Sequence, residues 1–200
     1  MPPRVPSREK AEDILQAARR VLGRKGYAGA TINEVAKEAG VSRGLLHYYF
    51  KSKEDMLARV IRETVEATAS MAEDLFKQSR DARGLARNLV QAMRAFVESD
   101  PDFSSIFFES WGLTRQSKRV DQDLRDLYHR FVEAVRSGLE DAARRWVIPF
   151  PADLQGLAMV ITAILDGMSF QIMAMPELLE RPGMWEAVED AILRVLDAEA

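Results

Sequence analysis

The sequence predicts an all-α protein of about nine helices, in which an amino-terminal three-helix module with a helix-turn-helix precedes a larger helical bundle. Apolar residues recur at intervals of three and four along most of the 200 residues, and no segment alternates like a half-buried strand. Between residues 31 and 57, capping residues and a glycine mark two short helices joined by a tight turn. The apolar fraction of 47% is enough for a substantial core.

The first helix is expected to begin after Ser7, which can cap it, and to run to about Gly23, with Gly23 and Gly26 ending it. Arg4, Arg8 and Lys10 lie at its start, where positive charge opposes the helix dipole. A neighbouring phosphate is one reason for cations in that place. The three- and four-residue spacing predicts a buried stripe of Ala11, Ile14, Leu15, Ala18, Val21 and Leu22.

The second and third helices are predicted from capping signals. Thr31 stands three residues before Glu34, the spacing at which a cap hydroxyl and a returning carboxylate satisfy each other's backbone N–H groups. A helix is therefore expected to begin at Thr31. It should end at Gly40, because glycine readily adopts the positive φ that closes a helix. Ser42 can then cap the third helix.

The third helix has an unusual outward face. Leu46 and Phe50 are four apart and are expected to point inward, which leaves one cation, one glycine and three rings outside. A solvated surface does not ordinarily need this set, whereas a helix in a DNA groove can use it for guanine, thymine-methyl and phosphate contacts. A helical hairpin with aromatic residues in its core is the alternative. The predicted DNA-binding residues are Thr31, Ser42, Arg43, Gly44, Leu45, His47, Tyr48, Tyr49 and Lys53.

This stretch resembles the DNA-binding signature of the TetR family of one-component regulators. His47 is a departure, since the family more often has a tyrosine at that position. The matching residues are Gly26-Tyr27, Ala30-Thr31-Ile32, Val35-Ala36, Ala39-Gly40-Val41-Ser42, Gly44, Tyr49-Phe50, Ser52-Lys53-Glu54 and Leu57.

The resemblance implies a DNA-binding domain at residues 1–50 and an effector-binding and dimerisation domain at residues 51–200. It also implies a ligand-responsive transcriptional regulator that binds double-stranded operator DNA as a homodimer. We expect a repressor that a small apolar or amphipathic effector releases from a palindromic operator. The alternatives are an activator of the same fold and, from a different class, a helical dimerising scaffold that does not bind DNA.

A long fourth helix is expected from Ser52, which with Asp55 repeats the capping spacing, to about Ser79. By its position it joins the DNA module to the rest of the chain, so an effector that tilts its far end would move the recognition helix. Asp100 and Pro101 are expected to start the sixth helix, and prolines within residues 146–151 to end the seventh. The five later helices are predicted at about residues 85–97, 101–111, 117–145, 152–175 and 182–197.

The eighth helix is apolar almost all round, so it must be central or form half of a subunit interface. The resemblance implies that the last two helices form a four-helix bundle with the same pair from a second subunit. Asp166 and Gln171 are expected to hydrogen-bond across that interface. The predicted interface residues are Ile161, Ile164, Leu165, Met168, Trp185, Val188, Ile192 and Leu196.

The middle of the chain is rich in aromatic residues and methionine. Aromatic residues at helical spacing are usually simple core, but the resemblance implies that some of these line an inducer cavity. Glu109, among the aromatics, could pair with a cationic or hydrogen-bonding ligand. The predicted pocket residues are Met71, Met93, Phe96, Phe103, Phe107, Phe108, Glu109, Trp111, Tyr128 and Phe131.

Composition narrows the function further. There is no cysteine, and the two histidines, His47 and His129, are far apart with no nucleophile motif or phosphate-binding glycine loop. We therefore expect no enzyme activity, no metal and no cofactor. Residues 1–60 carry a net charge of +5 and residues 61–200 one of −8, which places the excess of cations at the predicted DNA end.

The amino end lacks the apolar segment of a signal peptide, and the sequence is expected to hold no long uncharged apolar run that spans a membrane. Together with the absence of cysteine, this predicts a cytoplasmic protein without a membrane partner.

Overall fold

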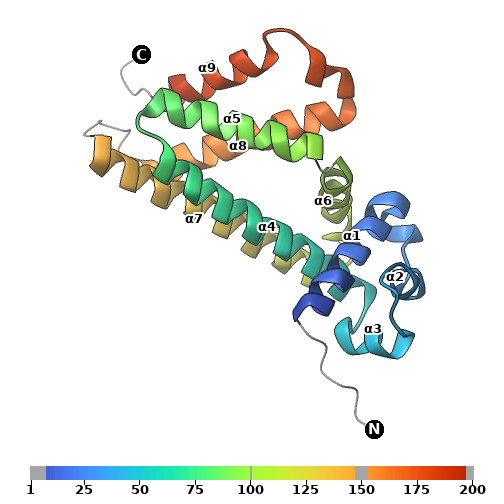
Figure 1. The fold of residues 1–200 in the computed structure, drawn as a ribbon. Coiled ribbons are helices and arrows are strands. Elements are labelled where there is room, and N and C mark those ends of the chain that lie inside the picture. Colours follow the sequence, from blue (N-terminus) through green and yellow to red (C-terminus); the bar gives the residue numbers. More distant parts are fainter. Residues whose placement is uncertain (1–7, 100, 147–152, 197–200) are drawn as a thin grey trace. The chain divides into compact units, whose positions relative to one another are not determined.

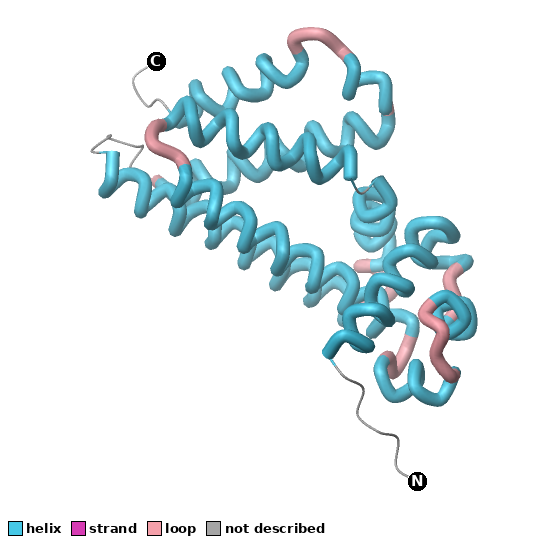
Figure 2. Tube along the Cα trace, in the orientation of Figure 1, coloured by secondary structure: helices cyan, strands magenta, loops and turns pink. Residues whose placement is uncertain are grey.

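The computed structural model describes residues 8–99, 101–146 and 153–196, and over these ranges Figure 2 shows helices joined by loops, without a strand. The all-α prediction is confirmed. The chain falls into two compact units, one of Met1–Thr64 with Asp102–Asp126 and the other of Val65–Pro101 with Leu127–Ala200. Helices α4 (Lys53–Gln78) and α7 (Lys118–Trp146) contribute residues to both units.

Some predictions concern residues outside the described ranges, namely Arg4, the caps at Ser7 and Asp100, and the prolines at 149 and 151. Two others concern the side chains of Arg8 and Phe103, which are not described although their backbone is. They stay predictions.

The first unit contains α1 (Arg8–Gly29), α2 (Ile32–Glu38) and α3 (Arg43–Tyr49), together with the start of α4, α6 (Pro101–Leu113) and the start of α7 (Figure 1). The unit therefore extends beyond the predicted three-helix module. Helix α2 packs on both α1 and α3. The largest fully buried side chains of this unit are Ile14, Leu22, Leu46, Phe50, Met56, Leu57, Ile61 and Leu124.

Of the two glycines expected to end the first helix, Gly23 stays within it. The helical conformation continues to a bend at Gly26, whose φ of 66° and ψ of 172° are not helical. Glycine inside a helix costs only about 0.5–1 kcal/mol relative to alanine, and the buried Val21 and Leu22 hold this turn against the core. The break therefore falls at the glycine that adopts positive φ.

In the second unit α5 (Ala82–Ser99), α8 (Leu154–Ala174) and α9 (Met184–Leu196) pack against one another, and Figure 1 shows them side by side. Asp153 caps α8, since its Oδ1 accepts a hydrogen bond from the N–H of Gly156 at 2.9 Å. A 3-10 helix, η1 (Pro176–Glu180), follows α8. The sequence patterns did not predict η1, because a single proline-initiated turn is too short for a helical period.

Most of the predicted dimer-interface residues lie in the core of the chain itself, and their part in a subunit contact stays a prediction. Because α8 and α9 fold onto α5, five of the eight predicted interface residues lie in the core of the chain itself, and Ile164, Met168 and Trp185 pack partly buried against it. The buried five are Ile161, Leu165, Val188, Ile192 and Leu196.

The opposite face of α8 is apolar and exposed. Met159 is 56% exposed, Val160 46% and Phe170 51%, and Ala163 and Gly167 lie between them on the same face. By length and composition α8 could cross a membrane, although Asp166 interrupts its apolar sequence, so the expectation that no uncharged apolar run spans a membrane stays a prediction. About a third of the helix is buried inside the chain, and core helices of other proteins pass the same test of length and composition. We define the exposed α8 face as Met159, Val160, Ala163, Gly167 and Phe170.

Candidate nucleic-acid interface

Helix α2 begins as predicted. The hydroxyl of Thr31 accepts a hydrogen bond from the N–H of Glu34 at 3.3 Å, and the carboxylate of Glu34 accepts one from the N–H of Thr31 at 3.1 Å. The same hydroxyl donates to Glu34 at 3.0 Å. Thr31 is exposed but its polar groups serve the capping box, so its predicted DNA contact stays a prediction.

The turn and the start of α3 also follow the capping signals. Gly40 has a φ of 61°. The hydroxyl of Ser42 accepts a hydrogen bond from the N–H of Leu45 at 3.2 Å, which caps α3. Leu46 and Phe50 are fully buried, so the side of α3 that packs inward is confirmed.

We expect Ser42→Ala to lower the free energy of unfolding by about 1 kcal/mol, because the N–H of Leu45 loses its cap. Denaturant unfolding monitored by circular dichroism measures this change. Ser70→Ala is the control, since Ser70 is exposed in the interior of α4 and caps no helix. An unfolding free energy equal to that of the wild type would contradict the capping role.

The outward face of α3 has the predicted composition. Arg43, Gly44 and His47 are exposed, and Tyr48 is 54% exposed. Leu45 and Tyr49 are half-buried. The Nε–H of Arg43 donates to Nε2 of His47 at 3.3 Å, and this bond orients the guanidinium along the helix. A Cβ at Gly44 would have no neighbour closer than the Ser42 hydroxyl at 4.0 Å, so packing inside the chain does not explain this glycine.

The cations around α3 differ in their surroundings. Arg20 and Arg24 are both paired with Glu38, at 3.0 and 2.7 Å. In the described part of the chain, by contrast, Arg43 and the exposed Lys51 have no ion-pair partner. Lys51 comes two residues after α3 and was not among the predicted site residues. Its position directly after the recognition helix was the signal that could have identified it.

Lys53 is held inside the first unit. Its Nζ donates to the carbonyl of Ala28 at 2.9 Å and lies 4.6 Å from the centre of the Tyr27 ring. These contacts hold the start of α4 against the end of α1. The predicted phosphate contact of Lys53 stays a prediction. Lys51 is the better candidate for a sequence-independent contact, because its ammonium group has no such bond within the described ranges.

The predicted effector pocket is divided between the two units. In the second, Met93 is buried, Phe96 and Phe131 are half-buried against the core, and Met71 is 50% exposed on α4. In the first, Phe107 and Phe108 are half-buried and Trp111 is 47% exposed. The role of these residues in effector binding stays a prediction.

The carboxylate of Glu109 has a partner that the sequence did not suggest. It accepts a hydrogen bond from the backbone N–H of Tyr27 at 2.6 Å. The contact occupies one carboxylate oxygen of Glu109, and the possible pairing of Glu109 with a ligand stays a prediction.

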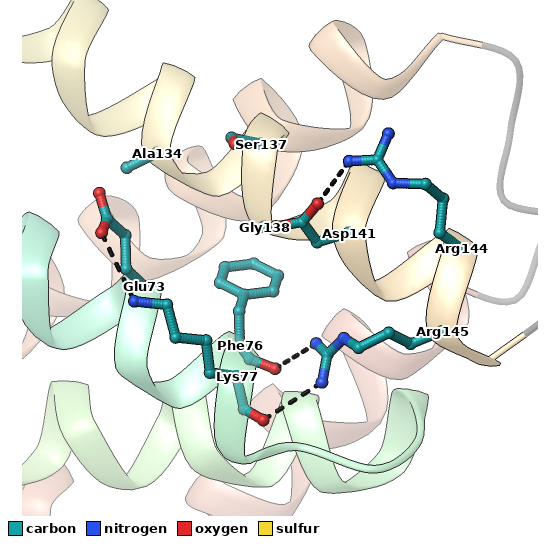
Figure 3. A pocket seen from close by; sticks show the side chains of 9 residues that line it. All are labelled: Glu73, Phe76, Lys77, Ala134, Ser137, Gly138, Asp141, Arg144 and Arg145. Atoms are coloured by element: carbon teal, nitrogen blue, oxygen red, sulfur yellow. Dashed lines mark hydrogen bonds and ion pairs between the residues drawn. The ribbon is translucent and has the colours of Figure 1, made fainter.

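A cavity of about 500 Å³ lies between α4 and α7 of the second unit, and Figure 3 shows its lining. It contains none of the predicted pocket residues. Its charged groups are paired with one another or with backbone: Lys77 lies 4.0 Å from Glu73, Arg144 pairs with Asp141, and Arg145 donates to the carbonyl of Phe76 at 2.6 Å. The other lining residues are Phe76, Ala134, Ser137 and Gly138.

Asp166 is the one acidic residue of α8, and its partner lies in the same chain. The hydroxyl of Tyr128 donates to Oδ2 of Asp166 at 2.9 Å, whereas the sequence had suggested a bond across a subunit interface. Burial raises the pKa of Asp166, and the hydrogen bond from Tyr128 lowers it by less. Burial and the neighbouring carboxylate of Asp166 together raise the pKa of Tyr128.

We expect Asp166→Asn to raise the thermal midpoint of unfolding at pH 7. A carboxyl group whose pKa is raised by folding binds its proton more tightly in the folded state, so the ionised form lowers stability once the pH exceeds the pKa of the unfolded chain. Below about pH 3.9 the group is protonated in both states and the two proteins should unfold at the same temperature. Calorimetry at pH 3 and pH 7 measures the difference. A gain of equal size at both pH values would contradict the role of ionisation.

No group of three or more histidine, aspartate or glutamate residues within the described ranges is arranged to hold a metal ion.

Two family models match the sequence. Residues 14–60 match the bacterial regulatory proteins of the tetR family, and residues 82–197 match the carboxy-terminal region of BetI-type transcriptional repressors. The first match covers α2 and α3, most of α1 and the start of α4.

Similar proteins include the nucleoid occlusion factor SlmA of Vibrio cholerae, which is 27% identical over 79% of this chain and 81% of that protein. The transcriptional regulator BetI of Agrobacterium fabrum is 28% identical over 82% of this chain and 75% of its own length. Among solved structures, a TetR-family regulator from Rhodococcus has a TM-score of 0.79 at 21% identity and covers 95% of this chain and all of the other. At this identity the structural likeness shows the fold alone.

Proposed function

The chain belongs to the tetR family of bacterial regulatory proteins, with a carboxy-terminal region of the BetI type, and from this membership we propose that it is a homodimeric repressor holding two copies of α3 on a palindromic operator. As a member of this family it is a ligand-responsive, DNA-binding transcription regulator. The sign of regulation, the dimer and the residue contacts are parts of the proposal. We also propose that the protein acts in the cytoplasm, where operator DNA is found, and that it catalyses no reaction.

The outward face of α3 is the observation that supports DNA binding most strongly. Ser42, Leu46 and Phe50 fix the orientation of the helix, so its exposed side is rigidly presented. Arg43 has no ion-pair partner within the described ranges and can form paired hydrogen bonds with O6 and N7 of guanine. Tyr48 and His47 supply polar tips that suit phosphate oxygens. Gly44 leaves room for close approach of the backbone.

The exposed α8 face supports the homodimer. A contiguous apolar surface of this kind is rare on a monomeric protein, and a second copy of the same face would cover it in a two-fold symmetric contact. Ala163 and Gly167 have small side chains that permit the two helices to approach closely. A dimer also matches the proposed target, because two recognition helices read half-sites about 34–36 Å apart, one turn of DNA.

The match of residues 82–197 to BetI-type repressors supports repression rather than activation. Effector binding in the second unit would shift the dimer toward a form that binds DNA less well. By reciprocity, operator DNA would then weaken effector binding by the same factor. Helix α4 supports such coupling because it contributes residues to both units.

Selection from a random duplex pool tests DNA binding even while the operator is unidentified. The purified protein should enrich a palindromic motif, and sedimentation of the complex should show two subunits per duplex. Deleting the gene should then raise transcription from promoters that carry the motif. Failure to enrich any motif would contradict the DNA-binding proposal, and a fall in transcription after deletion would favour the activator.

A further inference from the structure

The bend in α1 creates a backbone group that its own helix cannot satisfy. At Gly26 the chain leaves the helical conformation, and a new turn starts in which the N–H of Ala30 bonds to the carbonyl of Gly26 at 3.1 Å. The first N–H groups of any helical turn lack a carbonyl four residues earlier. Tyr27 carries the first of these N–H groups after the bend.

This N–H group donates a hydrogen bond to a carboxylate on a helix that is distant in the sequence. Oε2 of Glu109, on α6, accepts a hydrogen bond from the N–H of Tyr27 at 2.6 Å, and this bond is partly buried. The two residues are 82 positions apart in the sequence. A Cβ at Gly26 would lie 3.2 Å from both carboxylate oxygens. The carboxylate therefore lies directly over the bend, and the glycine provides both its positive φ and the space that the carboxylate occupies.

The same bend holds the start of α4. The carbonyl of Ala28 accepts the Nζ–H of Lys53, and the Tyr27 ring lies against that ammonium group. The Tyr27 hydroxyl hydrogen-bonds to Glu54 in the first turn of α4, and burial together with the charge and hydrogen bond of Glu54 raises the pKa of Tyr27 to about 12. Residues 26–28 thus connect α6 on one side with the first turn of α4 on the other, and α4 begins only a few residues after the recognition helix ends.

We infer that Glu109 is a positioning residue for DNA binding. Its carboxylate fixes the bend of α1. Through the contacts of Tyr27 and Lys53, the bend then fixes the position of the start of α4. Because α4 follows α3 closely in the chain, this also fixes the orientation of α3. A hydrogen bond to an ionised acceptor is stronger and shorter than a neutral one, which suits a contact that must hold a whole helix in register. This inference rests on the proposed function, because it assigns a residue to DNA binding that does not touch DNA.

The test compares Glu109→Ala and Glu109→Gln with the wild type on the duplex obtained by selection. We expect at least a tenfold loss of operator affinity for Glu109→Ala, since the N–H of Tyr27 is left without a partner. Glu109→Gln keeps a carbonyl oxygen at the same place and should lose no more than about threefold. Asp126→Ala is the matched control, because Asp126 is an exposed carboxylate of the same unit bonded to Gln122 on its own helix, and it should bind as the wild type does.

The hydrogen-exchange rate of the Tyr27 amide is a second measurement, and it does not require DNA. Loss of its acceptor in Glu109→Ala should speed this exchange at least tenfold, while amides of α5 and α9 in the second unit keep wild-type rates. A general loss of stability would instead speed exchange in both units. If Glu109→Ala does not fold, the test compares the amide proton chemical shift of Tyr27 in the wild type and in Glu109→Gln. Replacing the charged acceptor with a neutral one must move this resonance upfield.

The outcomes separate this inference from the proposed function. A wild type that enriches no duplex overturns the proposed function, and the exchange rates of Tyr27 still decide whether Glu109 holds the bend. A wild type that binds its duplex while Glu109→Ala binds equally well overturns the positioning role. An affinity loss in Glu109→Gln as large as that in Glu109→Ala overturns the assignment to the hydrogen bond with Tyr27.

Discussion

Gly167→Glu should convert the proposed dimer into monomers without unfolding the subunit. A Cβ at Gly167 would meet nothing within 4 Å, so the chain itself has room for the new side chain. Replacing an exposed helical glycine should even stabilise the subunit by about 0.5–1 kcal/mol. In a symmetric interface, however, two carboxylates would enter an apolar contact, and an unpaired buried charge costs about 3–5 kcal/mol. We therefore expect the dimer dissociation constant to rise at least about a hundredfold.

Analytical ultracentrifugation at micromolar concentration should show a species near the 22.6 kDa of one chain for Gly167→Glu and twice that mass for the wild type. Gly112→Glu is the matched control. Gly112 is also exposed on a helix with nothing within 4 Å of a Cβ, but it lies on α6. This control should remain dimeric. A Gly167→Glu protein that sediments as the wild type does would show that the exposed α8 face is not the subunit contact.

Arg43→Ala should cost about 1–3 kcal/mol on the selected duplex and relax the preference for one or two base pairs, because a paired contact with guanine is lost. On random DNA the loss should be much smaller. Fluorescence anisotropy with both duplexes measures the two affinities. The hydrogen bond to His47 orients the Arg43 side chain along α3, so less conformational entropy is lost when DNA is bound.

Lys51→Ala is the comparison for Arg43→Ala. Lys51 is exposed beside α3 without an ion-pair partner in the described part of the chain, and a phosphate contact from it would be independent of sequence. We expect this variant to weaken both duplexes by the same factor and to reduce the salt dependence by about one counterion. If Arg43→Ala behaves in this way too, Arg43 holds phosphate and does not read bases.

The helix-turn-helix could be predicted because its determinants are local. The spacing of Thr31 and Glu34, the glycine at position 40 and the cap at Ser42 act within one turn of chain, and each has its predicted hydrogen bond or φ. The inward side of α3 followed from the four-residue spacing of Leu46 and Phe50. Such features need no knowledge of what packs against them.

The rest depends on contacts between distant segments. Helix α8 is apolar on every side, so periodicity could not tell which face enters the core and which remains exposed, and Ile161 and Val160 were equally plausible at an interface. The partner of Glu109 lies 82 residues away, a relation that no spacing rule contains. The sequence offered two glycines as the end of α1, since only the backbone dihedral angles distinguish Gly23 from Gly26.

Methylation interference on the selected duplex tests the central claim that a dimer reads DNA with α3 in the major groove. Dimethyl sulfate modifies N7 of guanine in the major groove and N3 of adenine in the minor groove, so one experiment distinguishes the grooves. We predict interference at guanine N7 in two symmetric half-sites whose centres are about 34–36 Å apart or a multiple of that distance. Arg43→Ala should lose the interference at one guanine of each half-site. Interference confined to adenine N3, or to a single site without a symmetric partner, would contradict the account.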